Sequence, residues 1–161
     1  MKLKDNNLSI RYATTADAKI LCEWWNDGRI MAHAGFPNGT NTNVEEIEQK
    51  ILGETDDTMR RFIIEIDGVP AGEMNYKNKG NNVSEIGIKI CDFNQHGKGY
   101  GSRLLKIFVN YLFTGLNFDK ITLDTNKSNH RAQHVYEKLG FQMIKTEDDV
   151  CFYELVRGVR K

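Results

Sequence analysis

A glycine-rich segment of five residues, placed between an expected strand and an expected helix, constrains the fold of this chain most. Gly97, Gly99 and Gly101 alternate there, after the apolar run 83–90 and before apolar residues at helical spacing over 104–112. Glycine lets the backbone approach a ligand closely, and the first turn of a helix carries unpaired N–H groups with positive partial charge. The segment therefore predicts a cradle for a diphosphate group, or else a tight turn that binds nothing.

The residues around these glycines separate the common phosphate-binding motifs. The P-loop pattern G-x-x-x-x-G-K-[ST] does not occur in the sequence, which excludes that motif. A Rossmann motif would need a third glycine where Ser102 stands, and it would follow the first strand of a βαβ series. The cations Lys98, Arg103 and Lys106 flank the segment and favour an anionic ligand.

Hydrophobic periodicity predicts the elements on either side of this segment. Strands are expected at 8–12, 62–66, 71–76, 83–90, 120–125, 141–145 and 151–156. Helices are expected after Thr14 or Thr15, at 44–52, from the glycine segment to Leu112, and at 129–139. The resulting order, β-α-α-β-β-β-α-β-α-β-β, indicates a mixed α/β domain and not a regular βαβ repeat.

Length and composition indicate one soluble domain that spans residues 1–161. A chain with 40% hydrophobic and 27% charged residues is too apolar to be disordered. Its 22 Lys and Arg residues balance 22 Asp and Glu residues, so it lacks the basic excess of a nucleic-acid-binding protein. The sequence has no apolar run that could cross a membrane and no signal peptide at its start. We therefore expect a cytoplasmic protein with no nucleic-acid or membrane partner.

The cysteines and histidines predict no disulfide and no metal site. Cys22, Cys91 and Cys151 lie far apart without a C-x-x-C pair, which is typical of a reducing compartment. His130 and His134 have the spacing of two metal ligands on a helix, but no third ligand accompanies them. We expect core or surface roles for these side chains.

A second motif follows the glycine segment and completes a resemblance. Residues 129–141 read N-x-x-A-x-x-x-Y-x-x-x-G-F, and residues 96–101 contain G-x-G at the end of a six-residue loop. With this spacing and order of elements, the chain resembles the GNAT N-acetyltransferase superfamily, whose loop motif is [QR]-x-x-G-x-[GA]. The run W-W-N-D at 24–27 is similar to the branch of ribosomal-protein N-terminal and aminoglycoside acetyltransferases. The resemblance implies a mostly antiparallel sheet of about seven strands with about four helices, and direct acetyl transfer from acetyl-CoA to a primary amine.

The resemblance also implies which residues bind acetyl-CoA. In the family the diphosphate rests on loop amides, and the thioester carbonyl meets main-chain N–H groups where one strand parts from its neighbour, here near Ile90 and Cys91. Asn129 matches the residue that bonds the pantetheine arm, although a helix N-cap would also explain it. The loop starts with His96 where the family has Gln or Arg, but the family's phosphate contacts come mostly from the backbone. The expected cofactor-binding residues are Ile90, Cys91, His96, Gly97, Lys98, Gly99, Tyr100, Gly101, Ser102 and Asn129.

Two residues are expected to carry the chemistry. Tyr136 matches the family's proton donor to the leaving thiolate, a role that suits a phenol, although its spacing from Ala132 and Leu139 also fits an apolar helix face. Glu85 lies 14 residues before Gly99, the offset of the general base in the histone-acetylating branch, and a solvent-facing glutamate is the alternative. Glu73 on the preceding strand is the reserve candidate. Cys91 is not expected to carry the acyl group, because the family transfers it directly.

The acceptor is the least determined part of the function. The acidic residues Glu45, Glu46 and Glu48 lie on a helix that borders the acceptor site in the family, and they would attract a cationic amine. A small cationic amine is therefore expected, with a peptide N-terminus as the other acceptor class. Two other functions stay open: a non-catalytic acyl-CoA-binding sensor or interaction module on the same fold, and a nucleotide-binding domain. The acyl chain length and a homodimer also stay open.

Overall fold

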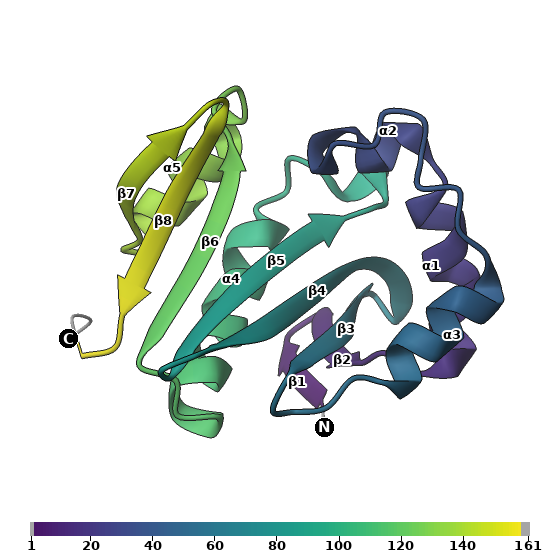
Figure 1. Ribbon diagram of the computed structural model, residues 1–161, viewed down its shortest axis with the longest axis horizontal. Coiled ribbons are helices and arrows are strands. Elements are labelled where there is room, and N and C mark those ends of the chain that lie inside the picture. Colours follow the sequence, from purple (N-terminus) through teal and green to yellow (C-terminus); the bar gives the residue numbers. More distant parts are fainter. Residues whose placement is uncertain (1, 159–161) are drawn as a thin grey trace.

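The computed structural model of the chain describes residues 2–158, which form one eight-stranded sheet (Figure 1). The strand order is β1-β2-β3-β4-β5-β6-β8-β7, and every neighbouring pair is antiparallel except β5 and β6. The strands are β1 (Lys2–Asp5), β2 (Leu8–Tyr12), β3 (Met59–Ile66), β4 (Val69–Gly80), β5 (Val83–Ile90), β6 (Lys120–Asn126), β7 (Gln142–Glu147) and β8 (Val150–Val156).

Helices cover both faces of this sheet. They are α1 (Ala18–Trp25), α2 (Gly28–Met31), α3 (Val44–Leu52), α4 (Tyr100–Asn110) and α5 (His130–Lys138). Short turns of 3-10 or π helix accompany them: η1 (Thr15–Asp17), η2 (Ala32–Ala34), η3 (Phe93–Gln95) and η4 (Tyr111–Gly115). The predicted mixed α/β fold with a mostly antiparallel sheet is confirmed.

The structure adds two elements that the periodicity did not predict. β1 pairs with β2 over four residues, but Leu3 is its only apolar side chain, so the segment carries no alternating pattern. The sheet consequently has eight strands where about seven were expected. The four-residue helix α2 lies in the segment between α1 and α3, and it is too short to show helical periodicity.

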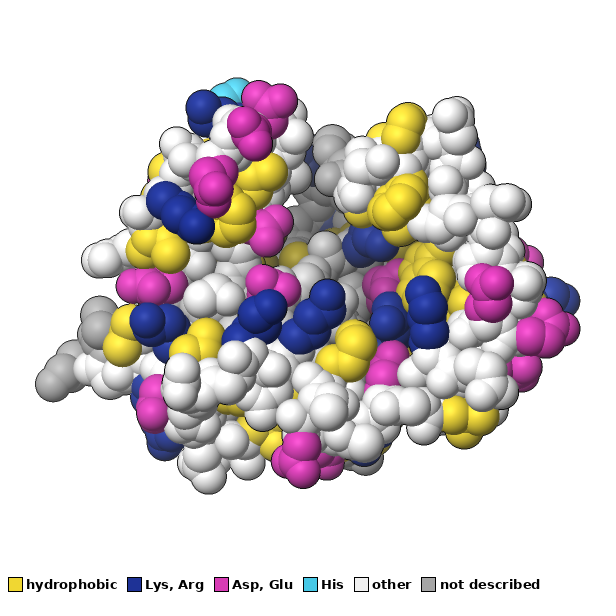
Figure 2. Space-filling view, viewed as in Figure 1, with side chains coloured by type: hydrophobic (Ala, Val, Ile, Leu, Met, Phe, Trp, Pro, Cys, Tyr) yellow, Lys and Arg dark blue, Asp and Glu magenta, His cyan; other side chains and the backbone are white. Residues whose placement is uncertain are grey.

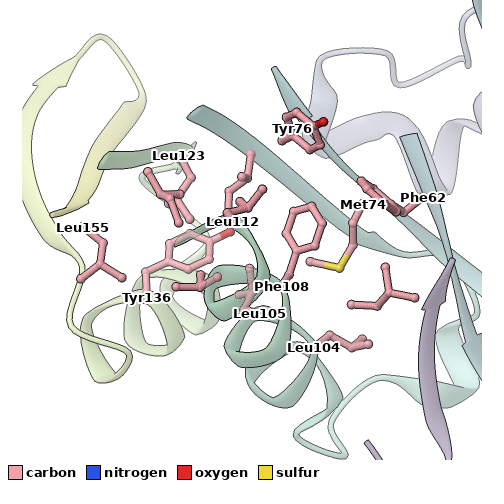
Figure 3. Packing of buried hydrophobic residues seen from close by; sticks show 14 of the residues in the cluster. Phe62, Met74, Tyr76, Leu104, Leu105, Phe108, Leu112, Leu123, Tyr136 and Leu155 are labelled. Atoms are coloured by element: carbon pink, nitrogen blue, oxygen red, sulfur yellow. The ribbon is translucent and has the colours of Figure 1, made fainter. Parts of the chain in front are cut away.

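Two hydrophobic cores lie on opposite faces of the sheet, because side chains alternate along each strand. On one face, Phe62 and Ile64 of β3 pack with Phe108 of α4 in the larger core (Figure 3). On the other face, Ile63 packs with Leu21 of α1 and with α3 in the smaller core. We call these the α4 face and the α1 face. Burial of each such side chain contributes about 1.5–3 kcal/mol to stability.

The sheet opens between β5 and β6. Their parallel pairing ends after three residue pairs, of which Glu85↔Thr122 is the last. β5 continues to pair with β4 as far as Ile90, whereas β6 continues to pair with β8 as far as Asn126. The two strands therefore diverge, and Figure 1 shows the gap widening towards the carboxyl end of β5.

Candidate active site

The opening between β5 and β6 is a cleft of about 1070 Å³. Its walls include Ile88 and Ile90, which pack against the larger core on the α4 face, and Lys89, which bonds to residues of the α1 face. Residues from both sides of β6 also line it, among them Leu123 and Asp124. The cleft therefore passes from one face of the sheet to the other. Figure 2 shows the surface hollowed between the β6–β8 part and α2.

One end of the cleft is the glycine loop. Gly97 and Gly99 both have φ +77°, which favours glycine, and Gly99 is the N-cap of α4. The amides of Gly97, Lys98 and Gly99 donate to no other residue in the part of the chain that the structure describes. A Cβ on Gly101 would meet no heavy atom within 4 Å, so its side of the helix faces open space. The loop and the helix N-terminus thus present unpaired N–H groups to the cleft, as an anion requires.

His96 fastens this loop to the end of β5. Its Nε2 donates to the carbonyl oxygen of Ile90 at 2.7 Å, and its ring packs edge-on against Phe93 with centroids 5.2 Å apart. The Lys98 ammonium group donates a hydrogen bond to Gln95 Oε1 at 3.3 Å, and Lys98 does not line the cleft. His96 therefore has a structural contact at the position where the family has Gln or Arg.

At the end of β5, successive main-chain N–H groups point in opposite directions. The N–H of Cys91 donates to the carbonyl of Ala71 at 2.7 Å, so it is not the free donor that the resemblance implied. Because successive N–H groups along a strand point to opposite edges, the N–H of Ile90 points away from β4 and into the cleft. The Cys91 thiol is 4% exposed in the smaller core, where burial raises its pKa to about 12. Cys91 therefore contributes neither an amide nor a reactive thiolate.

Tyr136 lies in the wall that α5 forms. Its side chain is 7% exposed and packs against Phe141 and Tyr153, with ring centroids 6.1 and 5.7 Å away. Figure 3 shows the ring reaching from α5 past Leu123 of β6, with its hydroxyl end towards Leu112. Its hydroxyl has no hydrogen-bond partner among residues 2–158. Burial, and secondarily the negative charge of Asp124, raise the pKa of Tyr136 to about 12, so the phenol stays protonated at neutral pH.

Asn129 is the N-cap of α5, as one of its two interpretations required. Its Oδ1 accepts a hydrogen bond from the N–H of Ala132 at 3.2 Å. Its side-chain amide group donates to no described residue, and Asn129 lines the cleft. Cap formation therefore leaves its two N–H groups available to a ligand.

The two candidate bases occupy different surroundings. Glu85 is the last residue of β5 that pairs with β6, on the face opposite Ile86, and it is not among the residues that line the cleft. Glu73 is 4% exposed and accepts a hydrogen bond from Trp25 Nε1 at 2.5 Å. Arg61 and Lys89 place cationic nitrogens 3.5 and 3.7 Å from its oxygens. The Glu73 carboxylate thus already has two cationic partners and a hydrogen bond, as an anchoring group has.

Glu73 belongs to a charged network that holds α1 and α3 on the sheet. Arg61 also bonds Glu54 at 3.2 Å, and its guanidinium lies 4.7 Å from the ring centre of Trp25. Burial raises the pKa of Glu54, and Arg61 only partly opposes that shift. Lys89 extends from this network to the cleft wall, where its Nζ also contacts the sulfur of Met31 at 3.1 Å.

Nine of the predicted site residues meet in one cleft, and the sequence analysis missed several others that line it. The nine are Ile90, His96, Gly97, Gly99, Tyr100, Gly101, Ser102, Asn129 and Tyr136, whereas Cys91, Lys98 and Glu85 do not line it. Arg131 of α5 and Asp124 of β6 also line the cleft. An aspartate inside a strand is unusual, and this was the signal that could have drawn attention to Asp124.

Two searches of the described residues concern other kinds of site. Among the side chains that the structure describes, no three His, Cys, Asp or Glu residues gather closely enough to hold a metal ion. None of the helices in residues 2–158 has the length and apolarity needed to span a bilayer.

Sequence comparison gives the relatives of the chain. Spermidine N(1)-acetyltransferase of Escherichia coli (strain K12) is 40% identical over 90 residues, which are 55% of this chain and 48%, about half, of that protein. Spermidine N(1)-acetyltransferase of Vibrio cholerae is 30% identical over 144 residues, with 85% of this chain and 80% of that protein covered. Aminoglycoside N(6')-acetyltransferase type 1 of Klebsiella pneumoniae is 27% identical over 167 residues, with 92% and 82% covered.

Solved structures share the fold. A spermidine N-acetyltransferase from Vibrio cholerae, in complex with CoA and spermine, superposes with a TM-score of 0.82 at 24% identity, over 94% of this chain and 96% of that one. An aminoglycoside acetyltransferase in complex with coenzyme A gives a TM-score of 0.76 at 24% identity, over 93% and 95%. The family model "Acetyltransferase (GNAT) domain" matches residues 7–142, which contain the whole glycine loop and α5. The chain therefore belongs to the GNAT acetyltransferase family.

Proposed function

We propose that the protein is an acetyl-CoA-dependent N-acetyltransferase that acetylates a primary amine of a small cationic molecule within a ternary complex. The observation that carries the proposal is the cleft through the sheet, with unpaired loop amides at one end and Tyr136 in its wall. Such a cleft lets two substrates meet from opposite faces, as direct transfer between them requires.

The residues present fit coenzyme A. The amides of Gly97, Gly99 and Gly101, at the N-terminus of α4, suit a diphosphate. Arg131 lines the same cleft and adds a cation for the remaining phosphate charge. The N–H of Ile90 and the side-chain amide of Asn129 suit the amide groups of a pantetheine arm or the thioester carbonyl. Acetyl-CoA, when bound, supplies the activated acetyl group.

Tyr136 and Glu85 are proposed to handle the protons. The N–C bond to the acceptor forms while the C–S bond breaks, and the sulfur that leaves takes the Tyr136 hydroxyl proton. Burial raises the pKa of this phenol to about 12, so it carries that proton throughout the neutral range. Glu85 lies outside the cleft lining, so it would take the acceptor's proton through an intervening water.

The names of the relatives support the acceptor class. The relatives named above act on spermidine or on aminoglycosides by name, and both are polycationic amines. A peptide N-terminus is the other acceptor class to test, because a ribosomal-protein-S5-alanine acetyltransferase from Vibrio fischeri shares the fold with a TM-score of 0.80 at 15% identity.

A thiol-release assay with acetyl-CoA tests the proposal. The panel contains spermidine, kanamycin and a peptide with a free N-terminal alanine, each measured with the wild-type protein and with Tyr136→Phe. We expect turnover with a cationic amine and its loss in the variant. Tight CoA binding without turnover of any amine would instead support a non-catalytic acyl-CoA-binding module.

A further inference from the structure

The charged residues that line the cleft are distributed unevenly. Arg29, Lys89 and Arg131 are its cations, and within the described part of the chain Asp124 is the one acidic residue of its lining. Arg29 is already paired with Asp27 at 2.9 Å, and Lys89 lies 3.7 Å from Glu73. The cations on the β5 side therefore have their counter-ions, whereas the carboxylate on the β6 side does not.

The Asp124 side chain lies at the open gap between β5 and β6. Pairing of β5 with β6 ends at Glu85↔Thr122, so Asp124 lies level with Gly87, where the strands have separated. Gly87 contributes no side chain to that gap, and a Cβ added there would meet Asn75 Nδ2 at 3.1 Å. The Asp124 carboxylate makes no hydrogen bond or ion pair with any of residues 2–158. A charged group of modest size can therefore reach it without displacing a protein partner.

The position of Asp124 relative to Tyr136 places it on the acceptor's path. The neighbouring residue Leu123 is buried on the α4 face, so Asp124 points to the α1 face. Asp124 and Tyr136 nevertheless line the same cleft, and the charge of Asp124 adds to the effect of burial in raising the pKa of Tyr136, so the two groups face each other through the opened sheet. An amine that enters from the α1 face and approaches Tyr136 therefore passes Asp124.

The surroundings of Asp124 favour the binding of a cation beside it. Asp124 is exposed to the open cleft. Partial loss of hydration there and the nearby negative charge of Glu85 raise the pKa of Asp124, and Lys77 on β4 opposes them. A cation bound beside Asp124 would relieve both the repulsion from Glu85 and the loss of hydration.

On the basis of the proposed function, we infer that Asp124 is a specificity-determining residue that holds an ammonium group of the acceptor. The reacting nitrogen must be neutral when it attacks, whereas a carboxylate holds an amine best while that amine is charged. Asp124 therefore holds a second ammonium group, and the acceptor class is an amine with at least two cationic groups.

The test compares two acceptors in four proteins. Spermidine carries further ammonium groups beyond the reacting one, whereas n-butylamine does not. Each acceptor is assayed with the wild type, Asp124→Asn, Asp124→Glu and the matched control Asp148→Asn. Asp148 lies in the exposed β7–β8 turn with φ +51°, a conformation that asparagine tolerates equally well.

Loss of the charge in Asp124→Asn is expected to raise the KM for spermidine roughly 10- to 100-fold, the effect of losing a charged hydrogen bond. The kcat for spermidine, the KM for n-butylamine and the Kd for CoA stay within about threefold of the wild type, which a merely unfolded variant would not achieve. Asp124→Glu recovers part of the loss, and Asp148→Asn behaves as the wild type. The KM for spermidine also rises with salt more steeply in the wild type than in Asp124→Asn.

Calorimetry separates failure of this inference from failure of the proposed function. Spermidine is titrated into CoA-saturated wild type and Asp124→Asn. Binding to the first and not to the second supports the inference even without turnover. An unchanged KM in Asp124→Asn, equal use of both amines by the wild type, or absence of spermidine binding to the wild-type complex each overturns it while CoA still binds. Failure of CoA itself to bind would instead refute the proposed function.

Discussion

The two ends of the cleft are built in different ways. The loop end is made of consecutive residues, 96–102, and it offers main-chain N–H groups held by glycine geometry. The α1-face end is lined by side chains from distant parts of the chain. One of them, Lys89, is held from behind by Glu73 of β4, which also bonds to Trp25 and Arg61. The loop end uses main-chain N–H groups, which do not depend on residue type, whereas the α1-face end depends on contacts between particular side chains.

This difference decides how each end can be altered. A main-chain N–H cannot be removed by substitution, so the loop end is sensitive to added bulk and to changes of backbone angle. The α1-face end is sensitive to the loss of a single charged partner, because the others are then left buried without compensation. The predictions below test these two sensitivities and the residue that stands between the ends.

The largest effect is expected at Tyr136, which belongs to neither end. Tyr136→Phe removes the proposed proton donor and should lower kcat by about 100- to 10,000-fold, the usual range for general acid catalysis. Because its hydroxyl has no partner in residues 2–158, CoA affinity and the free energy of unfolding should change little. The measurement is steady-state kinetics beside CoA calorimetry.

Tyr153→Phe is the matched control for this substitution. Tyr153 packs against Tyr136, but its hydroxyl donates to Glu137 at 3.1 Å and it does not line the cleft. The control should lose some stability and keep its kcat. Equal losses of kcat in the two variants would show that a general disturbance around α5, and not loss of the proton donor, explains the result.

The next effect concerns the network of the α1-face end. Glu73→Ala leaves the Arg61 and Lys89 cations and the Trp25 N–H without their shared partner, and it should lower the free energy of unfolding by about 3 kcal/mol. CoA affinity should stay within about twofold, because the loop end is separate. Urea unfolding measures the first quantity and calorimetry the second. Glu48→Ala, which removes a glutamate with no partner among the described residues, should leave both almost unchanged.

A smaller effect is expected where α1 begins. Burial raises the pKa of Asp17, but hydrogen bonds from Arg11 and from the amide of Thr14 lower it more, so the net shift is downward. A carboxylate with a lowered folded pKa stabilises the protein above its unfolded pKa, and this contribution is lost as pH falls through the folded pKa.

Asp17→Asn should therefore cost about 1–2 kcal/mol at pH 7 and much less at acid pH. Urea unfolding as a function of pH checks this. A constant difference between wild type and variant from pH 7 down to pH 2 would contradict the assigned role of the Arg11 pair.

The smallest effect is expected at His96. Its Nε2 bond to the carbonyl of Ile90 is one contact between the loop and β5, and His96 is an exposed residue. His96→Ala should weaken CoA binding only about threefold, because one exposed hydrogen bond contributes little. His96→Gln should bind as the wild type does. A loss of CoA affinity as large as that expected when a side chain is added at Gly101 would mean that the His96 side chain, and not the loop backbone, holds the diphosphate.

The same contrast explains which elements the sequence predicted. α3 and β5 begin and end at the predicted residues, 44–52 and 83–90, because their apolar side chains repeat at clear periods. β4 runs from Val69 to Gly80, well beyond the predicted 71–76, since its last residues pair through the main chain while their side chains are exposed. Pairing of that kind leaves no hydrophobic pattern in the sequence.

The candidate site divides in the same way. The loop residues and α5 could be recognised because each motif is contiguous and its geometry is local. The contact of Arg61 with Trp25 could not be predicted, because the positions of these residues in the sequence do not show which side chains come together on the sheet. Asp124 was missed for a related reason: its place in the cleft depends on where β5 and β6 stop pairing, and only the structure shows that point.

The central claim is that the unpaired amides at the start of α4 hold the diphosphate of coenzyme A, and one calorimetric comparison tests it most directly. A side chain added at Gly101 would enter open space next to those amides, so Gly101→Val should fold normally while its branches fill the cradle. Gly53→Val, at the end of α3 with only ordinary contacts to its Cβ, is the control. We predict that wild type and Gly53→Val bind CoA alike, and that Gly101→Val binds at least about 100-fold more weakly, equivalent to ~2.7 kcal/mol. Equal affinity in all three proteins would contradict the claim.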